Sequence, residues 1–207
     1  LNEHQPGVPL PTRENILRAL DAVVRDNQES LGSGVDGPGV CAAFNVVHFS
    51  GHGMQRYEGP CGDEPDHQDE VFVPLDYGQG RLLVDDDLYA RFVARLPVGS
   101  LTLHLQDSCH SGSPLDLPWR LTLDACDEPE WVCESQDHRP GYLQGGIVVA
   151  LGMCRDAQTS ADSYFQDERK WNGAGTRGFL FATDDGRSLF SKPLLEVLRD
   201  LTKWLRA

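Results

Sequence analysis

The stretch LTLHLQDSCHSGS, residues 101–113, joins an apolar run to a cluster of small and polar residues. The apolar part is typical of a β-strand, and it stops at Asp107, two residues before Cys109. Cysteine is usually buried and behaves as a small hydrophobic residue. A strand end that delivers a cysteine into polar surroundings marks a candidate for chemistry, although an inert buried thiol is the commoner outcome at such a position.

The rest of the chain alternates strand-like and helix-like segments. Apolar runs at 40–49, 71–76 and 145–154 predict strands, and the first and last of these suit parallel strands buried on both faces. Helical periodicity occurs at 11–26, 84–96 and about 191–206, with Thr12 placed to cap the first helix. We expect loops at 55–70, at 113–144 and in the polar stretch from 158. The alternation predicts an α/β layered domain with a mostly parallel sheet.

The composition excludes some classes of protein. The 207 residues fit one domain, and 32 acidic against 18 basic residues give a net charge of −14. This charge opposes nucleic acid as a partner and favours metal ions or substrates that carry Lys or Arg. The sequence has no apolar run of membrane-spanning length and no recognisable signal peptide, so we expect no membrane association. The six cysteines form no CxxC pair, which opposes a zinc site and favours a reducing, cytoplasmic setting.

A second predicted strand also ends in a reactive residue, because VVHF is followed by SGHG, which contains His52. Active sites of parallel α/β sheets lie beyond the carboxyl ends of the strands. If the two strands are neighbours, His52 and Cys109 emerge at the same edge. A thiol with a pKa of about 8.5 needs a base to become a thiolate, and an imidazole can also protonate a leaving amine. The N–H groups of Gly53 and Cys109 are candidates to face a developing oxyanion.

Three other histidines compete for attention. His48 and His104 lie inside strand runs, and we interpret both as ordinary core or interface residues. His110 follows the candidate nucleophile directly and is a weaker candidate for the base, because adjacent residues at a strand end point apart.

The motifs HFSGHGMQ (48–55) and DSCHSGSPLDLPW (107–119) resemble the paired His and Cys motifs of the metacaspases. The stretches PTRENILRAL, DEVFVPLDY, VDDDLYARFVARLPVGSLTL and CRDAQTSAD agree with the family in the order of its type I members. The resemblance implies one caspase-like catalytic domain over 1–207, a three-layer sandwich of sheet and helices. It divides into a large part at about 1–125, a linker at 126–144 and a small part at 145–207. The family's domain normally opens with an apolar strand and helix that have no equivalent here, so we expect the first strand to be missing.

The resemblance also implies a cysteine endopeptidase that cleaves protein or peptide substrates after Arg or Lys. His52 would be general base and then acid, Cys109 the nucleophile, and Gly53 part of the catalytic site. Ser50 and Asp107 lie two residues before the dyad members, and alternation places them on the same strand faces. A hydroxyl and a carboxylate suit a guanidinium or ammonium, and the resemblance places both residues in the specificity pocket. A turn-capping role is the alternative for Asp107.

Calcium activation is a further implication of the resemblance. The matching acids are Asp69, Asp85, Asp86 and Asp116, and carboxylates from several loops can supply the oxygen ligands that calcium requires. A solvated acidic face is the alternative. We expect a monomer, by resemblance alone. Two other functions stay open: a non-catalytic caspase-like binding module, which the absent first strand favours, and a structural, acidic metal-binding protein, which leaves the His and Cys motifs unexplained.

Overall fold

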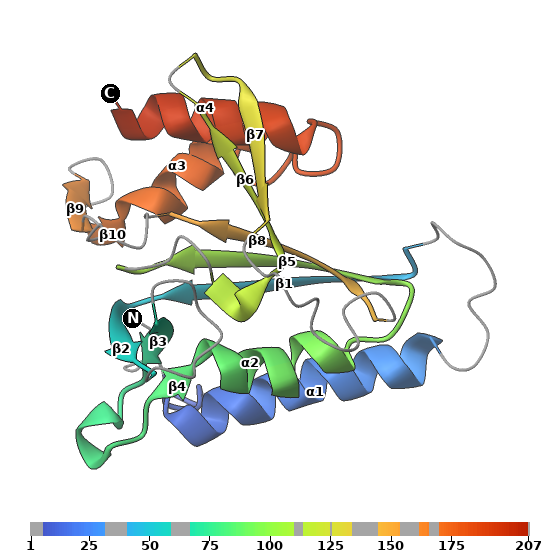
Figure 1. Ribbon diagram of the computed structural model, residues 1–207, viewed down its shortest axis with the longest axis vertical. Helices are drawn as coiled ribbons and strands as arrows, with labels where there is room; N and C mark the ends of the chain where they lie inside the picture. Colours follow the sequence, from blue (N-terminus) through green and yellow to red (C-terminus); the bar gives the residue numbers. More distant parts are fainter. Residues whose placement is uncertain are drawn as a thin grey trace.

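A parallel three-stranded sheet forms the centre of the molecule (Figure 1). The computed structural model describes residues 6–31, 41–58, 67–109, 114–124, 126–133, 145–153, 162–165 and 170–206. Its central strands are β1 (Ala43–Ser50), β5 (Ser100–Asp107) and β8 (Ile147–Gly152), in the order β1-β5-β8. The apolar runs that predicted these strands thus form one sheet, with β5 in the middle.

Helices cover both faces of this sheet. Helices α1 (Arg13–Leu31) and α2 (Asp85–Arg91), followed by the short 3₁₀ turn η2 (Val93–Arg95), lie on one side in Figure 1, and α3 (Ala174–Ala182) and α4 (Leu194–Arg206) lie on the other. Two separate apolar clusters fill the two interfaces. The first includes Leu17, Val24, Leu88, Phe92 and Val148, and the second includes Leu103, Leu105, Leu151, Phe179 and Leu201. This arrangement confirms the expected three-layer caspase-like architecture.

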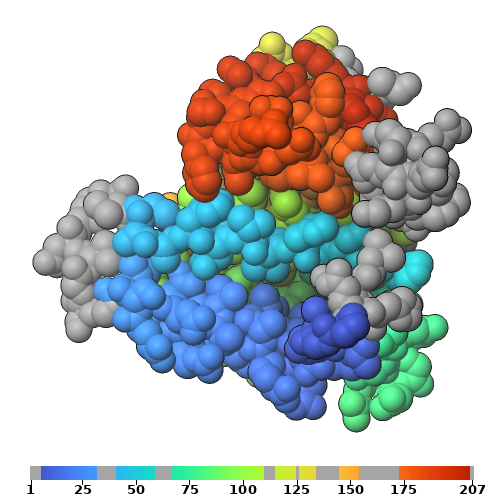
Figure 2. All heavy atoms as spheres, turned by 180° about the vertical axis from the view of Figure 1, so that it is seen from behind, coloured from blue at the N-terminus to red at the C-terminus, as the bar shows by residue number. Residues whose placement is uncertain are grey.

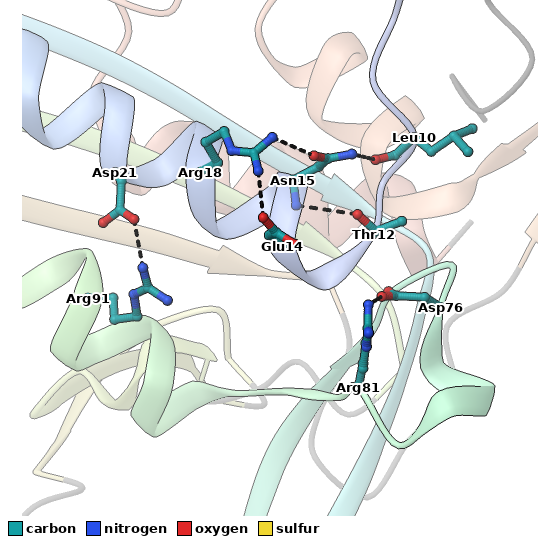
Figure 3. Close-up of polar contacts among 9 residues, drawn as sticks. All are labelled: Leu10, Thr12, Glu14, Asn15, Arg18, Asp21, Asp76, Arg81 and Arg91. Carbon is teal, nitrogen blue, oxygen red and sulfur yellow. Dashed lines mark hydrogen bonds and ion pairs between the residues drawn. The ribbon is translucent and has the colours of Figure 1, made fainter.

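The start of α1 follows the expected capping pattern. The backbone N–H of Asn15 donates to Thr12 Oγ1 at 3.3 Å, and the Asn15 side chain donates to the carbonyl of Leu10 at 3.0 Å (Figure 3). The first bond satisfies an N–H group that a helix leaves free in its first turn, and the second ties the preceding segment to the helix. Asp21, further along α1, pairs with Arg91 at the end of α2 at 2.7 Å, which links the two helices of this layer.

Smaller strands surround the central sheet. Strands β2 (His52–Tyr57), β3 (Gln68–Val73) and β4 (Leu83–Val84) form an antiparallel sheet, and β6 (Trp119–Leu123) pairs with β7 (Pro129–Cys133). Strand β9 (Asp162–Phe165) pairs with β10 (Lys170–Gly173), and the 3₁₀ turns η1 (Tyr77–Gln79) and η3 (Pro114–Asp116) complete the described elements.

Several of these elements correct the predicted loops. Strand β2 occupies part of 55–70, the β6–β7 hairpin lies within 113–144, and β9, β10 and the start of α3 lie in the polar stretch from 158. The strand sequences among them are polar or alternating, and pairing with a partner strand supplies the order that local composition does not indicate.

Strand β1 forms one edge of the described sheet. Figure 2 shows it as a cyan band across the surface between α1 and the helices of the opposite layer. Val46 is 54% exposed on this strand, so β1 is less covered than β5 at the centre. Among the described helices, none combines the length and the apolar character required to cross a bilayer.

Candidate functional site

The ends of β1 and β5 meet at one edge of the central sheet. The two strands are parallel neighbours, and the last pair in their register is Ser50 with Asp107. Just beyond this pair, the Gly51 N–H donates to the Asp107 carbonyl at 3.2 Å. The expectation that the His-bearing and Cys-bearing strands are adjacent is therefore confirmed, and the residues after each strand enter the same region of the surface.

The backbone of Gly53 lies directly against that of Cys109. A Cβ added at Gly53 would lie well inside van der Waals contact of the Cys109 carbonyl oxygen, and 3.0 Å from Ser108 Oγ. Only glycine lets the two segments approach this closely. His52 immediately precedes this contact and is exposed, whereas Cys109 is half-buried. The structure thus brings an accessible imidazole-bearing residue beside a partly sheltered thiol-bearing residue.

Asp107 is buried, with 3% of its surface exposed. Its Oδ2 accepts hydrogen bonds from the Thr176 N–H at 2.6 Å and from the Thr176 hydroxyl at 2.5 Å. Thr176 lies in the first turn of α3, where free N–H groups and the helix dipole favour a carboxylate. Asp107 therefore caps the start of α3, so the capping role weighed for it is present at a helix rather than at a turn. Ser50 is exposed on the neighbouring strand.

His48 contacts the same helix start, since its Nε2 lies 3.0 Å from Thr176 Oγ1. Although much of His48 stays exposed, loss of hydration on the side facing α3 lowers its pKa, and the Asp107 carboxylate acts in the opposite direction. His48 is thus an interface residue, as predicted. Sequence reasoning missed Thr176, because the polar stretch around it carries no helical periodicity. Its contacts with Asp107 and His48 are 69 and 128 residues away along the chain.

The predicted calcium ligands lie on neighbouring elements. Asp69 on β3 forms an ion pair with Arg56 of β2. Asp85 is buried at the start of α2, where its Oδ2 accepts the Glu70 N–H at 2.8 Å. Asp86 is exposed and follows it in the same turn. Asp116 lies in η3 at a positive φ of 48°, and η3 packs against α2.

Repulsion between carboxylates links Asp86 to Asp69 among these acids. Partial burial raises the pKa of Asp86, and the carboxylates of Asp69, Glu58 and Asp87 raise it further. Clustered carboxylates of this kind are the right donors for calcium. Within the described part of the chain, however, no three acids, histidines or cysteines converge as a metal site. Asp69 pairs with a guanidinium and Asp85 with a backbone N–H, so the donor chemistry fits calcium while the coordination shell is not assembled.

Two other expectations concern histidines. His104 is buried at 3% exposure on β5, as predicted for a core residue, and burial lowers its pKa to about 4. It is therefore a neutral imidazole near pH 7. His110, the weaker candidate for the base, lies outside the described residues.

Comparison with known proteins agrees with this geometry. The profile of the family described as "Metacaspase, peptidase C14 domain" matches residues 2–118, which is more than half of the chain. The chain belongs to the metacaspases. Metacaspase-2 of Arabidopsis thaliana is 34% identical over 194 residues, covering 91% of this chain and 42% of the relative. Metacaspase-1 of Mycosarcoma maydis is 31% identical over 230 residues, covering 93% and 54%.

A third metacaspase, Metacaspase-5 of Trypanosoma brucei brucei, is 33% identical over 178 residues, covering 84% of this chain and 33% of the relative. The chain therefore spans about half the length, or less, of these relatives. Membership in the metacaspases is consistent with the parallel sheet, with helices on both of its faces, and with the two adjacent strand ends that carry the His and Cys motifs.

Proposed function

We propose that the chain is a cysteine endopeptidase that cleaves after Arg or Lys and is activated by calcium. The observation that carries the proposal is the contact of Gly53 with Cys109 at the shared end of β1 and β5. This contact places the residue after His52 on the residue that would act as nucleophile.

The proposed reaction uses these groups in two steps. His52 takes the proton of the Cys109 thiol, and the thiolate attacks the carbonyl carbon of the peptide bond. The carbon–nitrogen bond breaks as His52 gives that proton to the leaving amine, leaving a thioester. His52 then takes a proton from water, the water oxygen attacks the thioester, and the thiolate is released. The N–H groups of Gly53 and Cys109 are the proposed donors to the oxyanion formed in each step.

The preference for basic residues rests on Asp107 and Ser50. Both lie at the last registered pair of β1 and β5, next to the proposed dyad. Asp107 is buried, and burial strengthens its attraction for a guanidinium or ammonium that reaches it. Thr176 holds Oδ2 of this carboxylate, which fixes its orientation. The net charge of −14 adds a long-range attraction for basic substrates.

Calcium would be held by carboxylates of Asp69, Asp86 and Asp116, with Asp85 supporting the start of α2. When bound, it would neutralise clustered negative charge and order the segments that carry these acids. The chain's own contribution is to gather the acids on β3, α2 and η3, which pack against one another or lie close together. Binding requires that Asp69 release the Arg56 guanidinium or share its oxygens with the ion.

Hydrolysis of matched fluorogenic peptides tests the proposal. Peptides ending in Arg, Lys or Asp before the reporter are compared, each with calcium and with a chelator. We expect hydrolysis of the Arg and Lys peptides only, dependent on calcium and abolished in Cys109→Ala. The control is Cys133→Ala, which removes an exposed thiol and should leave the rate unchanged.

A charge-removing variant separates specificity from folding. Asp107→Asn keeps an oxygen that can accept the Thr176 N–H, so α3 should remain in place. We expect it to lose preference for Arg over a neutral residue. Equal hydrolysis of Arg and Asp peptides by the original chain would refute the specificity, and a chain inactive on every peptide would refute the peptidase itself.

A further inference from the structure

Strand β5 carries a row of buried polar side chains that ends at the proposed active site. His104 and Gln106 share the face of the strand toward α1 and α2, and Ser108, the first residue after the strand, continues the alternation. They are 3%, 1% and 0% exposed. The residues on the opposite face, Leu103 and Leu105, are apolar and pack toward α3 and α4.

Hydrogen bonds join the three side chains into one hydrogen-bonded series. His104 Nε2 lies 2.8 Å from Gln106 Oε1, and Gln106 Nε2 donates to Ser108 Oγ at 3.0 Å. Because Gln106 Oε1 can only accept, the Nε2 of the neutral His104 ring carries the proton. His104 Nδ1 has no hydrogen-bond partner among the described residues, so the hydrogen-bonded series begins at His104 and runs toward Ser108.

The last member lies beneath the proposed oxyanion donors. Ser108 is bonded directly to Cys109, and its Oγ lies 3.0 Å from the position of a Cβ built on Gly53. The hydroxyl therefore lies close to both backbone segments that meet at the site. Because Ser108 Oγ accepts the hydrogen bond from Gln106, its position is fixed from the core of the sheet.

Such a row has no obvious role in stability. Burial of polar side chains costs free energy that their hydrogen bonds only partly offset, and apolar residues of similar size pack at least as well. A fully bonded network does, however, fix the geometry of the groups at its end. Oxyanion donors need that rigidity, since they act only when they are aimed in advance at the developing charge.

We propose that His104, Gln106 and Ser108 are positioning residues that hold the Gly53 and Cys109 backbones in the geometry required for oxyanion stabilisation. This inference rests on the proposed peptidase function. Because we assign these residues to positioning of the backbone, we expect their loss to slow the turnover step and to leave substrate binding unchanged.

The variants are Ser108→Ala, which removes the receiving hydroxyl, and Gln106→Met, which keeps the side-chain length but removes both bonds. The control is Thr102→Val on the same strand face. Thr102 is also fully buried and accepts a hydrogen bond from Asn45 Nδ2 at 3.2 Å, but it lies six positions before Ser108. It reports what loss of a buried polar contact does to the fold alone.

Two reactions of Cys109 separate positioning from thiol reactivity. Peptide hydrolysis passes through an oxyanion, whereas alkylation by iodoacetamide does not. We expect both variants to lower kcat by about tenfold or more with KM within about twofold. The rate of Cys109 alkylation, followed by peptide mapping, should stay within about twofold of the original chain. The kcat of the double variant should fall no further than that of Ser108→Ala, because both changes interrupt the same hydrogen-bonded series.

Three results would overturn the proposal while leaving the peptidase intact: an unchanged kcat in both variants, an equal loss in Thr102→Val, or a parallel loss of alkylation. Absence of hydrolysis by the original protein is distinguishable from these three results. It would refute the proposed function together with the role of the hydrogen-bonded series.

Discussion

The contact between Gly53 and Cys109 makes Gly53→Ala the most informative single substitution. The new methyl group would overlap the Cys109 carbonyl oxygen and lie 3.1 Å from its carbonyl carbon. Ordinary contacts between carbon and other heavy atoms need about 3.5 Å, so the Cys109 segment must move away by more than about 1 Å. The obstacle is backbone, which cannot swing aside as a side chain can.

A displacement of this size has a large expected effect on the reaction. Misplacing reacting groups by about 1 Å costs about 100-fold in rate. We therefore expect Gly53→Ala to lower kcat/KM for an Arg peptide by about 100-fold, measured under conditions in which the original chain is active. Circular dichroism and thermal unfolding should show a folded protein, because the change is confined to the end of the central sheet.

The matched control is Gly51→Ala, two residues earlier. A Cβ there would meet the Phe49 ring at 3.2 Å, and a ring at the end of a side chain can shift slightly. Neither glycine has a positive φ, so backbone strain does not separate the two variants. We expect Gly51→Ala to keep kcat/KM within about threefold. If Gly53→Ala hydrolyses the peptide as well as Gly51→Ala does, the inferred packing of the catalytic segments is wrong.

Three other predictions concern stability. Asp107→Ala removes both hydrogen bonds to Thr176 and should lower the free energy of unfolding, measured in urea, by about 2 kcal/mol. Asp107→Asn should lower it by less, and equal losses in the two variants would contradict the capping role. The pKa of His104, about 4, lies below its unfolded value of about 6.5, so the unfolded chain binds more protons and stability falls as the pH falls through that range. From about pH 7.5 to about pH 5 this contributes a loss of about 2 kcal/mol, which should be missing from the pH dependence of His104→Asn. A hydrogen bond from Arg95, together with Arg91, lowers the pKa of the partly exposed Asp21. Because the pair is at the surface, Asp21→Asn should lower the free energy of unfolding by less than about 1 kcal/mol. A loss of stability that about 1 M salt leaves unchanged would contradict surface pairing.

The central sheet could be predicted because each of its strands carries a run rich in apolar residues. Runs of this kind suit only burial on both faces, and the motifs that follow β1 and β5 indicated that these strands end together. Strand β2 could not be predicted, because HGMQRY is polar and is ordered by pairing with β3. Its pattern alone does not distinguish an edge strand from a loop.

The sequence motifs supplied the candidate site residues, but the contacts around them could not be predicted. Sequence alternation placed Asp107 beside the dyad, yet only the fold brings Thr176 onto its carboxylate. The polar face of β5 shows the same limit. His104 was predicted to be an ordinary core residue, and its link through Gln106 to Ser108 depends on side-chain geometry that no sequence pattern specifies. Long-range contacts of this kind arise from packing and have no local signature.

Selective labelling of Cys109 tests the central claim most directly. Of the four cysteines in the described part of the chain, Cys41, Cys126 and Cys133 are exposed and Cys109 is half-buried. A reagent guided by access alone should therefore reach those three before Cys109. A peptidyl-arginine chloromethyl ketone, followed by peptide mapping, should instead modify Cys109 and should cease to do so in His52→Ala. Labelling of the exposed thiols ahead of Cys109, with no effect of His52→Ala, would contradict a His–Cys peptidase site at the end of β1 and β5.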